Sequence, residues 1–429
     1  MIESSRVFRP APRVSRLLHG GMHIDFISTS EGLLRIGSMP DISKLTAHHG
    51  LDDALVAVPP WEVTQAGDNY TGEEFVFWRA QTFGHPGRRY IGRHSHVDCL
   101  RRKLDAVFPY FFDDHRLRIV RKDWLDKWFL PEPVEETYAH RDLKIRFTAD
   151  NIEVWDKGDL LYNRRALAPD THPDRSVATT LAGLDRESAS TDNFTLTCIG
   201  SGNGFSGRSA SLLARIGKQA MWIDPCAFPA RSLADAGVHW DDITHILVTH
   251  NHEDHMSGIT ACLRRCAARK RQLTLITGKN IFRILTEQYQ PLFPDIHRMI
   301  RFLELTPGIP LDVDGMRITP RLNHHILPYG TLGLKVSAGG KTVGISGDTK
   351  FCTAINRVLG RPELEPDWFR ECDLVLHEID FFNAHGVHSY WQEVATLRDQ
   401  IPGRLYGYHS PEVVDPPIPL VRQGQTFRL

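Results

Sequence analysis

Apolar runs separated by turn residues predict the elements of the second half of the chain. Strands are expected over 194–199, 211–216, 220–223 and 243–248, the second and third as a hairpin-like pair. A short helix is expected over 232–236. Strands and helices that alternate in this way are typical of a layered α/β domain.

The part of the chain before residue 168 has a mixed pattern. The segment 143–164 alternates as three strands, with turn residues at Asp150-Asn151 and Lys157-Gly158. Helices are expected over 96–107 and 122–130. Frequent aromatic residues in this part, among them Phe75, Phe77 and Trp78, are interpreted as core and interface packing, with a stacking platform for bases as the minor alternative. The mixture predicts an α+β fold.

A polar segment at 168–193, which contains Pro169 and Pro173, separates the two parts. We therefore expect an N-terminal α+β accessory domain of unknown role at 1–190. A second domain is expected at 191–429. No internal repeat is visible in the sequence.

Composition is that of an ordinary globular protein, with 41% hydrophobic and 24% charged residues. Because 51 Lys and Arg oppose 52 Asp and Glu, no global basic field recruits nucleic acid. No apolar stretch is long enough to span a membrane, and the first residues lack the apolar block of a signal peptide. Seven cysteines without a C-x-x-C pair favour free thiols and a cytoplasmic location.

The most informative segment follows the strand expected over 243–248. Within six residues it holds three imidazoles and a carboxylate, from His250, His252, Asp254 and His255. Imidazole and carboxylate ligands suit Zn²⁺, and also Mn²⁺ or Fe. The alternative is a polar surface loop, but that interpretation does not explain why four metal-binding side chains lie so close together in the sequence.

Further candidate ligands follow later strands. His324 comes after the strand expected over 316–322, Asp348 after one at 342–345, and His409 after one at 404–408. Ends of strands are where open α/β sheets place their binding sites. Because successive strand side chains point to opposite faces, only one of the neighbours His324 and His325 is expected to coordinate.

These motifs together resemble the metallo-β-lactamase fold superfamily, in its RNase Z and cyclic-nucleotide phosphodiesterase-like branch. The resemblance covers about 194–411 and includes Ile223-Asp224-Pro225, Gly347-Asp348-Thr349, His377-Glu378 and His388-Ser389. It implies a four-layer αββα sandwich with a site for two divalent metal ions at one edge. Residues 191–429 would then form a hydrolase domain.

The resemblance also implies a role for each ligand. His250, His252 and His324 would hold one metal, and the context Leu322-Asn323-His324 matches the branch better than His325 does. Asp254, His255 and His409 would hold the second metal, and Asp348 would bridge both. The nucleophile would be a hydroxide shared by the metals, which Asp254 could orient. Glu253 receives no role.

A late motif separates phosphodiesterases from other hydrolases of this fold. The pattern Ser389-x-x-Gln392 predicts a helix that begins at Ser389, a favoured place for an anion. In the resembling branch the His of this motif protonates the leaving oxygen, which implies that role for His388. Glu378 would hold His388 in place. A plain packing or capping role for His388 is the alternative.

The function expected is therefore a dimetal phosphodiesterase that acts on a nucleotide, a cyclic nucleotide or a nucleic acid. The short interval between His324 and Asp348 leaves no room for the RNA-clamping arm of tRNA-processing relatives. One alternative is a hydrolase of a lactone, a β-lactam or a thioester. A minor alternative is a non-catalytic scaffold that its metals stabilise. The sequence leaves a homodimer open and indicates no membrane partner.

Overall fold

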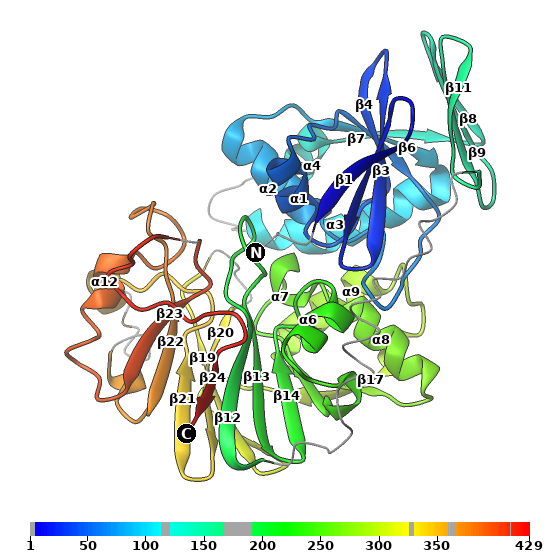
Figure 1. Ribbon diagram of the computed structural model, residues 1–429. Coiled ribbons are helices and arrows are strands. Elements are labelled where there is room, and N and C mark those ends of the chain that lie inside the picture. Colours follow the sequence, from blue (N-terminus) through cyan, green and yellow to red (C-terminus); the bar gives the residue numbers. More distant parts are fainter. Residues whose placement is uncertain are drawn as a thin grey trace.

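The structure is a computed structural model that describes residues 5–112, 121–166, 191–325, 330–358, 360, 366–411 and 413–429. The expected domain boundary lies mostly outside the described residues. Two halves are stacked on one another, the N-terminal half in blue and cyan and the C-terminal half in green to red (Figure 1).

The N-terminal half is built around a seven-stranded sheet in which β1 to β7 follow one another in chain order. The strands from β1 to β4 pair antiparallel and those from β4 to β7 pair parallel. The strands are β1 Arg6–Ala11, β2 Val14–His19, β3 Met22–Thr29, β4 Gly32–Ile36, β5 Leu55–Val58, β6 Arg88–Arg93 and β7 Phe129–Val134. The helices are α1 Ile42–His49, α2 Glu73–Phe83, α3 His94–Phe112 and α4 Arg121–Trp128.

A second, antiparallel sheet of four strands covers one face of the first. It consists of β8 Thr137–His140, β9 Leu143–Phe147, β10 Ile152–Asp156 and β11 Asp159–Asn163. Along β9 and β10 every second residue is buried, as a half-buried strand requires. Ile145 and Val154 of this sheet share one apolar cluster with Leu34 and Leu55 of the larger sheet. The three strands predicted over 143–164 are confirmed.

The C-terminal half begins with a seven-stranded sheet in the order β24, β12, β13, β14, β15, β16, β17. Its strands are β12 Thr191–Gly200, β13 Ser211–Gly217, β14 Gln219–Ile223, β15 His245–Leu247, β16 Leu273–Thr277, β17 Ile300–Glu304 and β24 Thr426–Arg428. The helical segments of this part are α6 Pro229–Asp235, η1 Trp240–Asp242, α7 Glu253–Met256, α8 Ile259–Ala268, α9 Lys279–Tyr289 and α10 Ile296–Met299.

A six-stranded sheet from β18 to β23 packs on it. Its strands are β18 Leu311–Val313, β19 Met316–Leu322, β20 Leu332–Ala338, β21 Lys341–Ile345, β22 Leu374–Glu378 and β23 Arg404–Tyr408. Leu334 and Ile345 of this sheet lie in one buried cluster with Leu213 and Leu247 of the other. The outer face packs against η3 Pro366–Phe369 and α12 Trp391–Ala395. Helix α11 Thr353–Val358 lies between β21 and β22 in the chain. The αββα sandwich of the metallo-β-lactamase fold is confirmed.

The two halves share one order of strands in their seven-stranded sheets, although no internal repeat is visible in the sequence. In each seven-stranded sheet, three antiparallel pairings at one edge are followed by three parallel pairings at the other. The strands follow the same chain order in both sheets, apart from the edge strands β1 and β24. The antiparallel strands β8 to β11 then correspond to β18 to β21. Counterparts of β22 and β23 are not present among the described residues of the N-terminal half. The order and direction of the strands are kept, whereas the residue identities are not, and the repeat is therefore invisible in the sequence.

One prediction about a helix start is wrong. The helix expected to begin at Ser389 begins at Trp391, with Tyr390 preceding it. The Ser389 hydroxyl instead donates a 2.6 Å hydrogen bond to the Thr349 carbonyl and accepts one from the Phe351 N–H. Because its side chain ties two loops together, it is not available as a helix cap.

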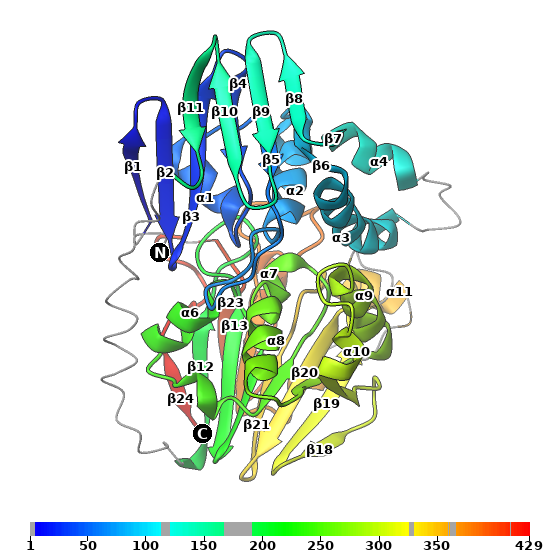
Figure 2. The ribbon, with the colours of Figure 1, turned by 90° about the vertical axis from the view of Figure 1, so that its right-hand side faces the viewer.

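A broad buried contact joins the halves. A single apolar cluster contains residues of both, and α3 packs beside α9 (Figure 2). Polar contacts also cross the junction, since the Thr260 hydroxyl donates to Asp68 and Lys44 donates to Ser209. Within the part of the chain that the structure describes, no helix is long and apolar enough to cross a membrane.

Candidate metal centre and active site

The loop after β15 is held in shape by Asp224 at the end of β14. The Asp224 carboxylate accepts hydrogen bonds from the N–H and the hydroxyl of Thr249, at 2.7 and 2.8 Å. It also lies 2.9 Å from Nδ1 of His255. A carboxylate on the outer nitrogen of an imidazole fixes the ring and directs the other nitrogen toward a metal. The sequence 249–255 therefore folds with its imidazoles turned inward.

A first group of candidate ligands comes from this loop and from two loops of the second sheet. One ligand atom from each member lies within 4.8 Å of the others, and the members are His250, His252, His325 and Asp348. The rings of His250 and His252 are 4.6 Å apart, and those of His252 and His325 are 5.1 Å apart. Four donors converge here although they come from separate loops.

The structure places His325, and not the preferred His324, beside the other candidate ligands. The His325 side chain is fully buried and 3.9 Å from Asp348, whereas His324 belongs to none of the ligand groups among the described residues. The His324 carbonyl accepts a hydrogen bond from the Lys350 N–H. Strand β19 ends at Leu322, so the alternation of a strand no longer decides which of the two imidazoles faces the site.

A second group consists of Asp254, His255 and His409. The rings of His255 and His409 lie 5.0 Å apart. Asp348 lies between the two groups, with its carboxylate oxygens 3.4 Å from His255 Nε2, 3.5 Å from His409 Nε2 and 3.7 Å from His250 Nε2. Because Asp348 lies close to imidazoles of both groups, its carboxylate is placed where it could bind two cations at once.

Several features of the site fit a pair of divalent cations. Asp254 Oδ1, Asp348 Oδ1 and His325 Nε2 are buried and have no hydrogen-bond partner among the described residues. Orphaned polar atoms of this kind are costly unless a ligand satisfies them. His409 adopts the left-handed backbone region, with φ 48°, and strain of this kind gathers at functional sites. The donor set of imidazoles and carboxylates suits zinc, manganese or iron.

Burial sets the protonation of the first group. It lowers the pKa of His250 and His252 well below the ordinary value and that of His325 to about 4. All three imidazoles are therefore neutral near pH 7, and neutral imidazole is the form that binds a metal.

The second group is different. Burial alone would lower the pKa of His409, but the carboxylates of Asp348 and Asp254 raise it to about 10. The pKa of Asp348 stays well below its ordinary value despite burial, because His409, His255 and His250 surround it. A cation that binds here must displace protons from the imidazoles, so metal uptake releases protons.

His388 stands at the rim of the centre, in contact with Glu378. Its Nδ1 lies 2.5 Å from the Glu378 carboxylate, which also accepts from the Thr349 N–H. Burial disfavours the charged imidazolium, but the Glu378 carboxylate outweighs it and raises the pKa of His388. The His388 side chain keeps 30% of its surface exposed. Asp348, Glu378, His388 and His409 also form a third group of candidate ligands.

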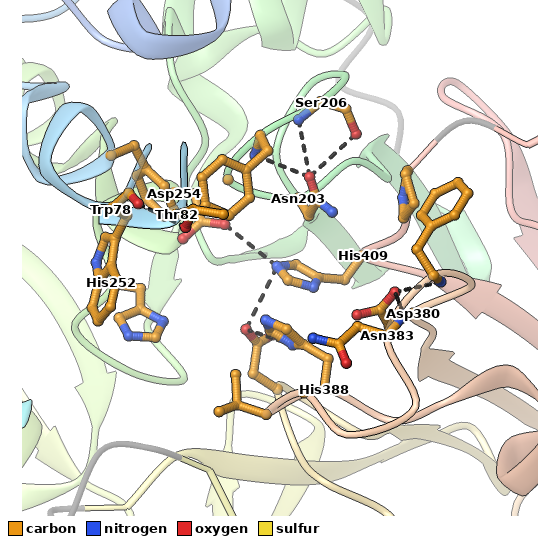
Figure 3. A pocket seen from close by; sticks show the side chains of 18 of the residues that line it. Trp78, Thr82, Asn203, Ser206, His252, Asp254, Asp380, Asn383, His388 and His409 are labelled. Carbon is orange, nitrogen blue, oxygen red and sulfur yellow. Dashed lines mark hydrogen bonds and ion pairs between the residues drawn. The ribbon is translucent and has the colours of Figure 1, made fainter. Parts of the chain in front are cut away.

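The metal edge opens into a cavity of about 490 Å³. Figure 3 shows His252 and Asp254 on one side of it and His388 and His409 facing them. The volume is typical of small-molecule sites, which span ~300–1,000 Å³. A Gly-rich loop at 200–207 follows β12. Its Asn203 also lines the cavity and orders the loop by accepting hydrogen bonds from the N–H groups of Phe205 and Ser206.

Sequence reasoning missed one side of this cavity. Phe75, Trp78, Thr82 and Phe83 of α2 line it, although α2 belongs to the N-terminal half. The aromatic run around residue 77 was interpreted as packing. Phe77, which is 1% exposed, does pack in the core. Trp78 also packs partly against that core, but Trp78 and Phe75 line the cavity as well. Only the fold brings α2 to the metal edge.

Comparisons with known proteins agree with this picture. The sequence model of the family described as Anti-Pycsar protein Apyc1 matches residues 194–426, which is more than half of the chain. The chain is 27% identical over 237 residues to the cGMP-dependent 3′,5′-cGMP phosphodiesterase A of Dictyostelium discoideum, a match that covers 51% of this chain and 26% of that protein. It is 25% identical over 167 residues to a ribonuclease Z of Mycobacterium bovis, covering 34% of this chain and 59% of that protein.

The chain thus spans less than two thirds of these curated relatives. Among solved structures, the short form of human tRNase Z superimposes with a TM-score of 0.44 at 16% identity, covering 54% of this chain and 98% of that one.

Proposed function

We propose that this chain, which belongs to the Anti-Pycsar protein Apyc1 family, is a dimetal phosphodiesterase that acts on nucleotide substrates. The observation that carries the proposal is the convergence of two ligand groups on Asp348, with His388 and its carboxylate partner Glu378 at the rim. Relatives named as a phosphodiesterase and as a ribonuclease match 51% and 34% of the chain, which supports the proposal.

The metals we propose are two zinc ions, with manganese or iron as substitutes. His250, His252 and His325 would hold one ion, Asp254, His255 and His409 the other, and Asp348 both. Two cations bound there would polarise the phosphoryl oxygens and lower the pKa of a water molecule. The carboxylates of Asp254 and Asp348 would offset only part of the charge of two divalent cations, so the centre would stay positive and attract an anionic phosphodiester.

The protein residues supply the remaining steps. Glu378 raises the pKa of His388 and so favours the protonated imidazole, and His388 is partly exposed toward the cavity. It can therefore donate a proton from Nε2 to the oxygen that leaves phosphorus. Glu378 orients the imidazole through Nδ1 and stabilises its positive charge, and we assign it a positioning role. Asp254 has one buried oxygen free to orient the attacking water.

Among nucleotide substrates we favour a small cyclic nucleotide over a long nucleic acid. The cavity has a limited volume and is bounded on one side by α2 of the N-terminal half. The Dictyostelium relative is named for cleavage of cyclic GMP. All seven cysteines are free thiols, which supports the proposal of a cytoplasmic location. Formation of a homodimer stays a prediction that sedimentation velocity can test.

The decisive experiment compares classes of substrate. Protein loaded with Zn²⁺ or Mn²⁺ is assayed on bis(p-nitrophenyl) phosphate, on 3′,5′-cyclic nucleotides, and on a panel of lactones, β-lactams and thioesters. We expect turnover of the phosphodiesters alone, and a loss of ~100-fold or more in kcat for a cyclic nucleotide in His388→Ala with metal content unchanged. Turnover confined to the carboxylic substrates would contradict the proposal, and no turnover of any substrate would favour a metal-stabilised scaffold.

A further inference from the structure

Helix α2 of the N-terminal half occupies the place that α7 and α8 occupy in the C-terminal half. In each half this helical segment follows the first parallel strand and precedes the next, β5 and β6 in one, β15 and β16 in the other. The starts of α2 and α7 meet reciprocally, because the Glu74 N–H donates to Glu253 and the Glu253 N–H donates to Glu74, each at 3.1 Å. The two helices are thus related by an approximate twofold arrangement.

The equivalent of the metal-binding loop has lost its ligands in the N-terminal half. Strand β5 is followed by Pro59-Pro60-Trp61 where β15 is followed by Val248, Thr249 and His250. All ligand groups found among the described residues come from the C-terminal half. The N-terminal copy of the fold therefore has a different use for the helix that follows this loop.

That helix turns aromatic side chains to the metal centre of the other half. Phe75, Trp78 and Phe83 line the cavity from α2, together with Thr82. Figure 3 shows Trp78 beside His252, across the cavity from Asp380 and Asn383. The Phe75 ring also meets Phe205 of the Gly-rich loop edge to face, with centroids 5.6 Å apart.

Exposed apolar side chains gather around the mouth of the cavity. Among the large apolar residues that the structure shows exposed, four line this one cavity: Phe83 at 65%, Phe205 at 48%, Phe382 at 76% and Val387 at 44%. Exposed aromatic residues concentrated at one opening mark a binding surface. They come from both halves, so the surface exists only when the halves are docked.

We propose that the N-terminal half is a copy of the fold whose α2 forms the specificity wall of the active site, and that Trp78 and Phe75 on this wall stack against the nucleobase of the substrate. The inference rests on the proposed phosphodiesterase function. The wall is aromatic and the opposite side carries the charged metal edge, so a ligand with a planar ring at one end and a phosphate at the other fits both. Neighbouring contacts fix α2, since Glu73 at its start is bound by Arg35 and Tyr90.

The test separates recognition of the base from hydrolysis. Wild type and Trp78→Ala are assayed on thymidine 5′-(p-nitrophenyl phosphate) and on methyl p-nitrophenyl phosphate, which share a leaving group but differ in the nucleoside. We expect kcat/KM for the nucleoside substrate to fall roughly tenfold, as loss of one base–aromatic stacking contact implies. The methyl substrate should change less than about twofold. Gln81→Ala, on the exposed side of the same helix, is the matched control and should change neither.

Equal losses on both substrates, or no loss on either, would overturn the wall proposal while leaving the phosphodiesterase function intact. If wild type hydrolyses neither substrate, the proposed phosphodiesterase function fails. Equilibrium binding then tests separately whether α2 recognises the nucleobase. Calorimetry of a nucleoside 5′-monophosphate against ribose 5-phosphate should show a preference for the nucleotide that Trp78→Ala and Phe75→Ala abolish. Equal affinities in wild type would overturn the proposal.

Discussion

The Lys103 ammonium group donates a 2.9 Å hydrogen bond to Oε1 of Glu253, which stands between the candidate ligands His252 and Asp254. Both side chains are buried, at 1% and 3% exposure. Lys103 lies on α3 of the N-terminal half, so one half of the chain fixes the metal loop of the other. This contact gives Glu253 a structural role that the sequence did not indicate.

We expect Lys103→Met to destabilise the protein and to weaken metal binding. The change leaves Glu253 buried beside Glu74 without its cation, and breaking a buried pair in this way costs about 3–5 kcal/mol. Denaturant unfolding and metal content measured by mass spectrometry check both effects. Arg102→Ala, which removes an exposed pair with Asp98 on the same helix, is the control. Unchanged stability and full metal content in Lys103→Met would contradict the prediction.

The identity of the third imidazole gives a direct test of the metal centre. We expect His325→Ala to bind one equivalent of divalent metal fewer than wild type, because His325 faces His250, His252 and Asp348. His324→Ala should keep the wild-type stoichiometry. Metal titration by calorimetry after dialysis against a chelator distinguishes them. The opposite pattern would restore the expectation drawn from the sequence and would show that the loop refolds on metal binding.

The candidate ligands in continuous motifs could be proposed from the sequence alone, and the structure brings them together. His250, His252, Asp254 and His255 follow a single strand, and Asp348 and His409 each follow a strand whose bounds the pattern predicted closely. It was insufficient beyond the end of β19, where no strand periodicity distinguishes His324 from His325. Residues such as Trp78 are indistinguishable from packing residues until two copies of the fold dock, because their role depends on contacts far away in the chain.

Glu378 is predicted to act through His388. In Glu378→Gln the carboxylate that raises the pKa of His388 is lost, so less imidazolium is present to protonate a leaving oxygen. We expect kcat for a cyclic nucleotide, whose leaving oxygen is basic, to fall about tenfold or more. Hydrolysis of p-nitrophenyl esters, whose leaving group needs no proton, should change little. Steady-state kinetics measure the ratio of the variant's kcat to that of wild type on each of the two substrates.

Glu371→Gln, at an exposed surface pair with Lys335, is the control for the Glu378 variant. An equal loss on both substrates together with a missing metal equivalent would assign Glu378 to the third ligand group instead. Full activity on both would remove Glu378 from the mechanism.

The N-terminal half contains a buried charge cluster that positions α2. Arg35 donates at 2.8 Å to Glu73 on that helix and at 2.9 Å to Asp53. Burial opposes ionisation of both carboxyl groups, but Arg35 outweighs it and lowers the pKa of each. The lowered pKa values of Asp53 and Glu73 contribute to the free energy of unfolding. This contribution is fully present above their ordinary pKa values of 3.8 and 4.5, and it is lost as the pH falls through the lowered pKa values of the folded protein.

Arg35→Met should therefore cost about 3–5 kcal/mol at pH 7. The difference from wild type should narrow as the pH falls toward 3, because the two carboxyl groups of the variant take up protons while it is still folded. Urea unfolding at several pH values measures this difference. The control is Arg317→Ala, which removes the exposed ion pair of Arg317 with Asp312. A constant difference at every pH would contradict the linkage.

The twofold relation between the halves predicts how the C-terminal half behaves alone. Its junction surface is apolar, since one buried cluster contains residues of both halves and α9 packs against its counterpart α3. Residues 191–429 produced as a separate chain would expose that surface to water, and a second copy of the same fold can cover it in the manner of the N-terminal half. We expect this fragment to sediment as a dimer or larger species with lowered activity on nucleotides, because α8 of a second copy does not carry the aromatic residues of α2. A stable monomer with the full activity of the intact chain would contradict the prediction. It would show that the N-terminal half is needed neither to bury the junction surface nor to line the cavity.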